Sequence, residues 1–191
     1  MGGSVRSFIA VHIPDAVRRD ISILIGGFRS CGGGEDVKWV RPESLHLTLK
    51  FLGDVEEERI GAAADAIERS VSAQPAFDLA LGGTGAFPNP RRPSVLWIGV
   101  RKGAEPLASL AGAVETGLAR LGFEAEKRPF SAHLTLGRIR SPGNAGKIVE
   151  RMTEAGFECD PFRIHAVHVM KSDLQRSGAV YTTLRTLNLK G

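Results

Sequence analysis

His46-Leu47-Thr48-Leu49 returns later in the chain as His133-Leu134-Thr135-Leu136, 87 residues further on (133 minus 46). Two copies of one His-x-Thr-x pattern predict a duplicated half-domain, in which each half contributes one histidine and one hydroxyl to a shared site. Histidine is the side chain best suited to proton transfer near neutral pH. A pair of them therefore predicts a paired general acid and general base.

Each copy is predicted to lie on a β-strand. Side chains of a strand alternate between its two faces, so His46 and Thr48 share one face, about 6–7 Å apart, while the leucines point into a core. The same holds for His133 and Thr135. A phosphate fits between two such pairs. In-line displacement at phosphorus needs this layout, because one group must take a proton from the attacking oxygen while another protonates the leaving oxygen.

The residues around the motifs predict alternating strands and helices. In the first half, strands are expected over 7–13, 38–40, 45–52, 77–81 and 94–100, and helices from Asp15 as N-cap and over 56–71. Gly53-Asp54 is expected to end the motif strand, and residues 82–93, rich in Gly, Pro and Arg, to form a loop.

The second half replays much of this order. It predicts helices over 107–121 and 146–155, the motif strand over 131–139, and strands over 162–171 and 179–189 joined at Ser177-Gly178. Many connections are too short for crossover helices, which favours an α+β fold with antiparallel sheets. No linker separates the halves, so one pseudo-symmetric unit is expected.

Composition bounds the function further. A chain of 191 residues with 42% hydrophobic content can bury one sizeable core. The net charge of +4 fits a polyanionic partner without requiring one, and 6% aromatic content argues against an extended base-stacking platform. No apolar run approaches membrane-spanning length and no signal peptide is recognised, so the expectation is a soluble, cytoplasmic protein with no membrane partner.

A family resemblance is carried by the residues around the motifs. The stretch from Trp39 to Gly53 resembles the first signature of the two-histidine (2H) phosphoesterases, in the RNA 2′,3′-cyclic phosphodiesterase branch historically called 2′-5′ RNA ligase. The second signature matches from Ala132 to Arg138, and the stretch from Val169 to Leu174 also resembles that family. The resemblance spans nearly the whole chain.

The resemblance implies a fold for the whole chain, 1–191. That fold is a single bilobal α+β domain, pseudo-twofold and duplicated, with two antiparallel sheets lining a central cleft and helices on the outside. Its two interleaved lobes would each carry one His-x-Thr-x motif. A monomer is expected.

The resemblance also implies an activity and a set of roles. The activity is hydrolysis of the 2′,3′-cyclic phosphate ends of RNA to 2′-phosphates, with no metal and no cofactor. His46 is then the proton donor and His133 the proton acceptor, while Thr48 and Thr135 bind the phosphate. Two similar sites could exchange these roles with the orientation of the substrate, so the pair is better determined than the labels.

Arg138 is a further phosphate-binding candidate, because it matches the second signature. It lies five residues after His133, so on a regular strand it would face away from the site unless a bulge or the strand end redirects it; a solvated arginine is the alternative. Lys50 and Arg140 are considered as cleft-lining cations, against ordinary solvated charges. Phe51 is expected mainly in the core, with a base-stacking wall as the alternative.

Several other functions stay open on the sequence. The same chemistry run in reverse is 2′-5′ ligation of tRNA halves, and a smaller substrate would make the protein a phosphodiesterase of cyclic nucleotides or 2′-5′ oligonucleotides. A catalytically silent protein that binds RNA ends is the alternative from another class. No cluster of acidic residues accompanies the motif histidines at metal-ligand spacing, so no metal site is expected.

Overall fold

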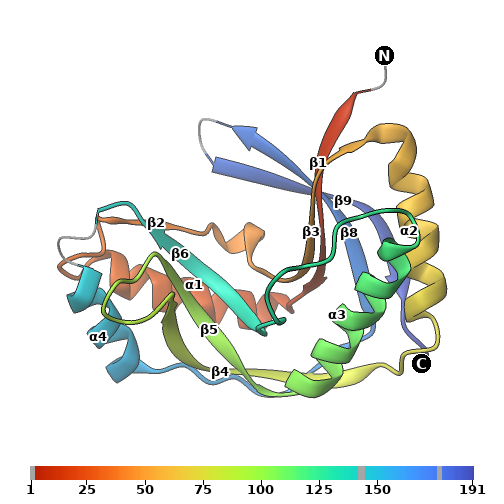
Figure 1. Ribbon diagram of the computed structural model, residues 1–191. Coiled ribbons are helices and arrows are strands. Elements are labelled where there is room, and N and C mark those ends of the chain that lie inside the picture. Colours follow the sequence, from red (N-terminus) through yellow and green to blue (C-terminus); the bar gives the residue numbers. More distant parts are fainter. Residues whose placement is uncertain (1–2, 142–144, 176–177) are drawn as a thin grey trace.

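The structure is a computed structural model that describes residues 3–141, 145–175 and 178–191 (Figure 1). Its helices are α1 Asp15–Arg29, α2 Glu57–Val71, α3 Ala104–Ala119 and α4 Ala145–Ala155, with one 3₁₀ turn, η1 Pro42–Ser44. Its strands are β1 Ser4–His12, β2 Val37–Trp39, β3 His46–Glu56, β4 Phe77–Phe87, β5 Val95–Lys102, β6 His133–Ile139, β7 Phe162–Ile164, β8 Ala166–Gln175 and β9 Gly178–Asn188.

The strands form two antiparallel halves that meet at the motif strands. One half runs β7-β4-β5-β6 and the other β3-β1-β8-β9, with the short β2 pairing beside β6. A single residue pair, Leu47 with Leu134, joins β3 to β6. The two expected sheets are therefore linked into one curled sheet, and the α+β fold class with antiparallel strands is confirmed.

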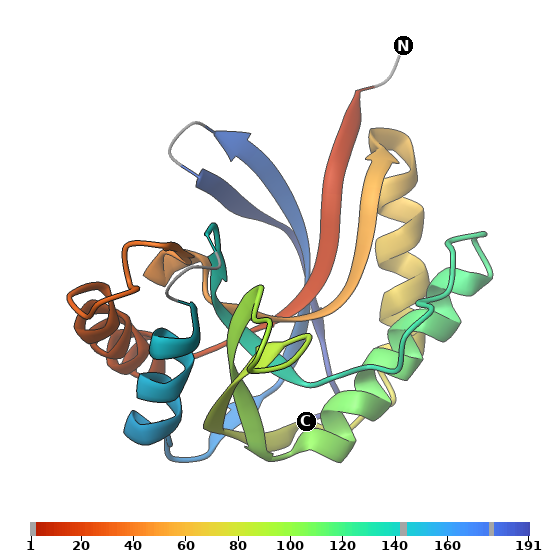
Figure 2. The same ribbon diagram turned by 60° about the vertical axis from the view of Figure 1, so that its left-hand side comes forward.

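Each half of the sheet is covered by helices that partly belong to the other half in sequence. α3 follows β5 in the chain, yet it packs against β3 and α2 across the molecule. α1 follows β1, yet it contacts α4, which packs on β4. Figures 1 and 2 show α2 and α3 together on one side and α1 and α4 on the other. The two halves are interleaved rather than placed one after the other along the chain.

The helices bury the apolar stripe that their sequence periodicity predicts. In α1 the buried positions are Val17, Ile21, Ile25 and Phe28, three or four residues apart, which places them on one face of a helix. The expected N-cap was wrong by one residue: Pro14 occupies that position, and Asp15 is the first helical residue, where it pairs with Arg18. A carboxylate in the first turn still complements the helix dipole.

Two strands extend beyond their predicted ends, because glycine was taken as a breaker. β3 continues past Gly53 to Glu56: Gly53 has φ +73 and pairs with Ser7, and the preceding Leu52 is bulged out of the register. β4 continues through the expected loop to Phe87. There Gly85 lies under the ring of Trp97, and a Cβ at this position would come 2.3 Å from the ring. Gly53 supplies a positive φ and Gly85 allows the close approach of Trp97, so neither glycine ends its strand. Ser177, expected in the last turn, lies outside the described residues.

Candidate active site

The two motifs meet at the centre of the sheet. Leu47 pairs with Leu134 in an antiparallel register, which places His46 across from Thr135 and Thr48 across from His133. The pair of leucines thus lies on a local twofold axis. By strand geometry the two imidazoles occupy the diagonal of this arrangement, about 7–8 Å apart at the backbone.

All five site residues expected from the sequence line one central cleft of about 410 Å³. The cleft lies at the junction of the two halves and also receives side chains from β1, β2 and the β8–β9 hairpin. The expected residues in its lining are His46, Thr48, His133, Thr135 and Arg138.

Both imidazoles are held in the same tautomer by the backbone. Nδ1–H of His46 donates to the carbonyl oxygen of Ser44 at 2.8 Å, and Nδ1–H of His133 donates to that of Ser131, also at 2.8 Å. A carbonyl can only accept, so Nδ1 carries the hydrogen in both rings and Nε2 is left for the cleft. The Nε2 of His46 lies 3.0 Å from the Thr48 hydroxyl. Each ring therefore presents one titratable nitrogen to a ligand.

His46 is enclosed by aromatic side chains. The ring of Phe8 lies 4.8 Å away, centroid to centroid, and that of Tyr181 stands edge-on at 5.2 Å. Burial lowers the pKa of His46 to about 4, because removal of water disfavours the imidazolium; the bond to Ser44 opposes this, and His12 adds slightly to it. In the empty cleft His46 is therefore neutral at pH 7.

His133 has more open surroundings. One aromatic ring, that of Phe87, stands edge-on to it at 4.9 Å, and its hydrogen bond to Ser131 is at the surface. Phe87 ends β4, the strand whose length the sequence underestimates. The two motif histidines thus share backbone geometry but differ in how much water reaches them.

A bulge in each motif strand changes which residues face the cleft. In β3, Ile9 pairs with Lys50 and Ala10 with Thr48, so Leu49 has no partner. In β6, Leu96 pairs with Gly137 and Trp97 with Thr135, so Leu136 has none. Each bulge shifts the alternation by one residue. As a result Arg138 lines the cleft on the same face as His133, whereas on a regular strand it would face away.

The equivalent position on β3 is Phe51, and its expected place in the core was wrong. Its side chain is 61% exposed and lines the cleft, as the alternative of a base-stacking wall requires. Lys50 in turn faces away from the cleft, where its buried Nζ bonds Glu115 and the carbonyl of Glu124. Arg140 is not among the residues that line the cleft. Neither Lys50 nor Arg140 is therefore the cleft cation considered from the sequence.

Three cleft cations were missed by the sequence reasoning. Arg6, Lys38 and Arg41 line the cleft, and Arg41 donates from Nη2 to the carbonyl of Ala179 at 3.0 Å. Arg41 lies within the first signature, which was the available signal for it. Arg6 and Lys38 come from β1 and β2, and nothing in their local sequence sets them apart from solvated charges.

Two further properties concern ligands and membranes. Among residues 3–141, 145–175 and 178–191, no group of three or more His, Cys, Asp or Glu side chains is arranged to hold a metal ion. Within those same ranges, no helix has the length and apolar character needed to cross a membrane.

Comparisons with known proteins agree with the geometry of the two halves. The LigT-like phosphoesterase family model matches residues 11–97 and again residues 98–181. A relative from Methanothermobacter thermautotrophicus, named RNA 2′,3′-cyclic phosphodiesterase, is 32% identical over 97% of this chain and 99% of its own length. One of the same name from Archaeoglobus fulgidus is 36% identical over 95% of this chain and 98% of its own length.

Solved structures give the same answer for the fold. A crystal structure of a Thermus thermophilus protein matches with a TM-score of 0.82 at 29% identity, covering 97% of this chain and 98% of its own. E. coli LigT complexed with 3′-AMP matches with a TM-score of 0.78 at 27% identity, covering 98% and 99%. Because the family model accounts for both halves and the relatives align over nearly their full lengths, this chain belongs to the LigT-like phosphoesterases.

Proposed function

We propose that this protein hydrolyses the 2′,3′-cyclic phosphate ends of RNA to 2′-phosphates by acid and base catalysis with two histidines and no metal. One observation carries the proposal: two imidazoles and two threonine hydroxyls, supplied by equivalent strands, line a single cleft around a local twofold axis. The names of the two relatives describe that activity for those proteins, and their similarity to this chain supports it here.

The roles of the residues follow from in-line displacement. His133 takes a proton from water, and the water oxygen attacks phosphorus. The bond from phosphorus to O3′ breaks on the opposite side, and His46 donates its proton to O3′, which leaves a 2′-phosphate. Thr48 and Thr135 donate hydrogen bonds to the phosphate oxygens, and Arg138 adds a charged donor. Proton exchange with solvent then restores both imidazoles.

His46 can act as the proton donor only if its imidazole is protonated when the substrate binds. Burial keeps its pKa at about 4 in the empty cleft, so the ring is neutral near pH 7. A phosphodiester anion within a few ångström favours the imidazolium and raises this pKa. Binding of the anion would thus be accompanied by uptake of one proton from solvent at Nε2 of His46, and the Thr48 hydroxyl, now an acceptor from Nε2–H, would turn its hydrogen toward the phosphate.

The organisation of the chain supports a single functional unit. We propose one domain over residues 1–191, made of two interleaved lobes that each supply one motif, because the helices of each sequence half cover strands of the other. We propose a cytoplasmic monomer whose substrate is an RNA end or a related nucleotide, and the net charge of +4 fits such an anionic substrate.

The test uses a short RNA that ends in a 2′,3′-cyclic phosphate, incubated in excess chelator. We expect conversion to the 2′-phosphate by the wild type, and its loss in His46→Ala and in His133→Ala. Activity that the chelator abolishes would refute the metal-free mechanism. Binding without turnover in the wild type would instead favour a silent RNA-end-binding protein.

A further inference from the structure

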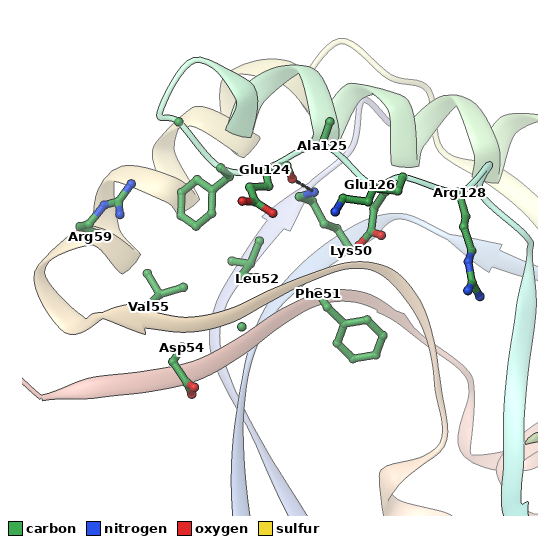
Figure 3. A pocket seen from close by; sticks show the side chains of 14 residues that line it. Lys50, Phe51, Leu52, Asp54, Val55, Arg59, Glu124, Ala125, Glu126 and Arg128 are labelled. Carbon is green, nitrogen blue, oxygen red and sulfur yellow. Dashed lines mark hydrogen bonds between the residues drawn. The ribbon is translucent and has the colours of Figure 1, made fainter.

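A second hollow, of about 630 Å³, adjoins the central cleft (Figure 3). It lies between the second part of β3 and residues 122–128, the segment that leads from α3 toward β6. Phe51 and Gly53 line both the hollow and the cleft. The two spaces therefore meet at Phe51.

The hollow exists because β3 and β6 diverge. Their one residue pair is Leu47 with Leu134, and within the described ranges no backbone ladder continues along this edge of β3. Lys50 fills the gap instead: its Nζ donates to the carbonyl oxygen of Glu124 at 2.7 Å and to Glu115 at 2.8 Å. Figure 3 shows the bond to Glu124 across the hollow. The Lys50 side chain thus separates residues 122–128 from β3 and holds them in place.

The lining of the hollow combines an aromatic ring with two available cations. Phe51 is 61% exposed, and Lys127 and Arg128 are exposed as well. Neither cation has a hydrogen bond or ion pair with any side chain that the structure describes. In Figure 3 Arg128 and Phe51 extend toward the same side, away from Arg59. Stacking surfaces and unpaired cations are the elements that bind single-stranded nucleic acid.

The end of the hollow at Arg59 has a different character. Arg59 is already engaged, because its guanidinium lies 5.0 Å over the ring of Phe123 and donates to the carbonyl of Leu121. The carboxylate of Glu124 lies on this side, with Glu126 between the two ends, while the carboxylate of Asp54 points away from residues 122–128. An anionic chain is attracted at the Phe51 end and repelled at the far end.

We propose that this hollow binds the RNA chain immediately 5′ of the terminal nucleotide, an inference that rests on the proposed function. A 2′,3′-cyclic phosphate closes the 3′ end, so the rest of the RNA can leave the cleft in one direction only. Phe51 stacks against a base, while Lys127 and Arg128 contact the backbone phosphates on either side of that nucleotide. The carboxylates of Glu124 and Glu126 limit the subsite to a short stretch of RNA.

A competing exit passes Lys38 and Arg41 on the other side of the cleft. There the guanidinium of Arg41 is committed to the carbonyl of Ala179 and lies 3.5 Å from Glu43. Fewer free donors are left on that side for a phosphate backbone. The exit past Phe51 is therefore favoured, and Lys38→Ala distinguishes the two.

The experiment compares a nucleoside 2′,3′-cyclic phosphate with a trinucleotide that ends in the same cyclic nucleotide. The variants are Lys127→Ala/Arg128→Ala and, as a control with equal loss of charge, Arg19→Ala/Lys147→Ala on α1 and α4, where both side chains are exposed. We expect the wild type to prefer the trinucleotide in kcat/KM by about tenfold or more, since one stacked base alone contributes that much and two phosphate contacts add to it. The Lys127/Arg128 variant loses the share of this preference that the phosphate contacts supply, retains the share due to Phe51, and keeps its rate on the mononucleotide.

Salt dependence gives a second readout. Each phosphate contact to a single strand contributes about 0.7 to the slope of log affinity against log salt, so losing two contacts makes the trinucleotide slope shallower by about 1.4. A tetra- or pentanucleotide should gain little over the trinucleotide.

Three results would overturn the subsite. They are equal kcat/KM for the mononucleotide and trinucleotide in the wild type, an equal loss of preference in the Arg19/Lys147 control, and loss of preference in Lys38→Ala alone. A failure of the proposed function looks different, because neither substrate would then be hydrolysed. In that case the affinity of a trinucleotide 2′-phosphate for wild type and the Lys127/Arg128 variant still tests the subsite, and equal affinities would overturn it.

Discussion

The two motif strands carry the same four residues in different surroundings. Around His46, two aromatic rings and a hydroxyl exclude water, and the pKa falls to about 4. Around His133 there is one edge-on ring and a surface hydrogen bond. After each bulge, moreover, β3 presents Phe51 where β6 presents Arg138. The motif supplies a symmetric pair of imidazoles, and the surrounding strands make that pair asymmetric.

The largest expected effect separates the two histidines by their roles. Loss of either is expected to lower kcat about 10²–10⁴-fold on a normal cyclic phosphate, because each carries one proton transfer. In a substrate with sulfur in place of O3′, the leaving group departs as a thiolate, which needs no proton. With this substrate His46→Ala should recover much of its activity, while His133→Ala should not. Steady-state rates on the oxygen and sulfur substrates measure the difference.

A double variant serves as the control for this experiment, since without the base it should show no recovery with sulfur. Recovery of His133→Ala in place of His46→Ala would exchange the two roles. It would mean that the solvated ring, rather than the enclosed one, protonates the leaving oxygen.

The next effect separates Arg138 from Phe51. Arg138→Ala should lower kcat/KM about 10–150-fold on every cyclic phosphate, because a hydrogen bond to a charged group contributes about 1.5–3 kcal/mol. Phe51→Ala should act only on substrates that carry a second base, 5′ of the terminal nucleotide, since stacking contributes about 1–3 kcal/mol per base. A nucleoside 2′,3′-cyclic phosphate, which lacks that second base, is the matched substrate. An effect of Phe51→Ala on that substrate would contradict the stacking role.

A smaller effect appears in stability at acid pH. The pKa of His46 is 6.5 in the unfolded chain and about 4 when folded, so the unfolded state binds the proton more tightly. This contribution to stability is complete above pH 6.5 and is lost as the pH falls toward 4. Between pH 7 and pH 5 the wild type should lose about 2 kcal/mol more unfolding free energy than His46→Asn.

Urea denaturation at both pH values measures this difference, with His133→Asn as the control for removing a motif imidazole. Identical pH dependence in the wild type and His46→Asn would show that burial does not disfavour the charged ring.

The smallest effect concerns the stability contributed by the residue that follows the bulge in each motif strand, Lys50 in β3 and Gly137 in β6. β3 has Lys50 there, buried and paired with Glu115, whereas β6 has Gly137, at which a Cβ would come 2.6 Å from Val37. Lys50→Met keeps the volume but leaves the carboxylate of Glu115 and the carbonyl oxygen of Glu124 without their donor, so the unfolding free energy should fall by about 1–2 kcal/mol. A loss well above this would show that the pair stabilises the fold, which chemical denaturation measures directly.

The sequence predicts the strands and helices well where periodicity is strong, as in α1 and the two motif strands. It fails at Gly53 and at 82–87, because a glycine that ends a strand looks the same in sequence as one that takes a positive φ within the strand or admits a neighbouring ring. Only the tertiary partner, such as Trp97 over Gly85, distinguishes them.

In the site, too, some features follow from the local sequence and others depend on tertiary partners. His46, Thr48, His133 and Thr135 could be placed on one face from alternation alone. The places of Phe51, Lys50 and Arg138 depend on the bulges at Leu49 and Leu136, and a bulge is set by pairing with β1 and β5 rather than by the local residues. Differences in burial between the two histidines come from Phe8, Phe87 and Tyr181, which are distant in sequence.

The exchange of helices between the two halves has a consequence for how the protein unfolds. Strand β3 is covered by α3, which enters the chain only after β5, and α1 reaches across to α4. A fragment that ends near residue 98 would therefore lack α3, one of the two helices that pack on its own motif strand. Amide hydrogens of β3 and β6 should open with similar free energies under native conditions, because the two strands are joined at Leu47 and Leu134. Assembly of the catalytic pair and completion of folding are then the same event.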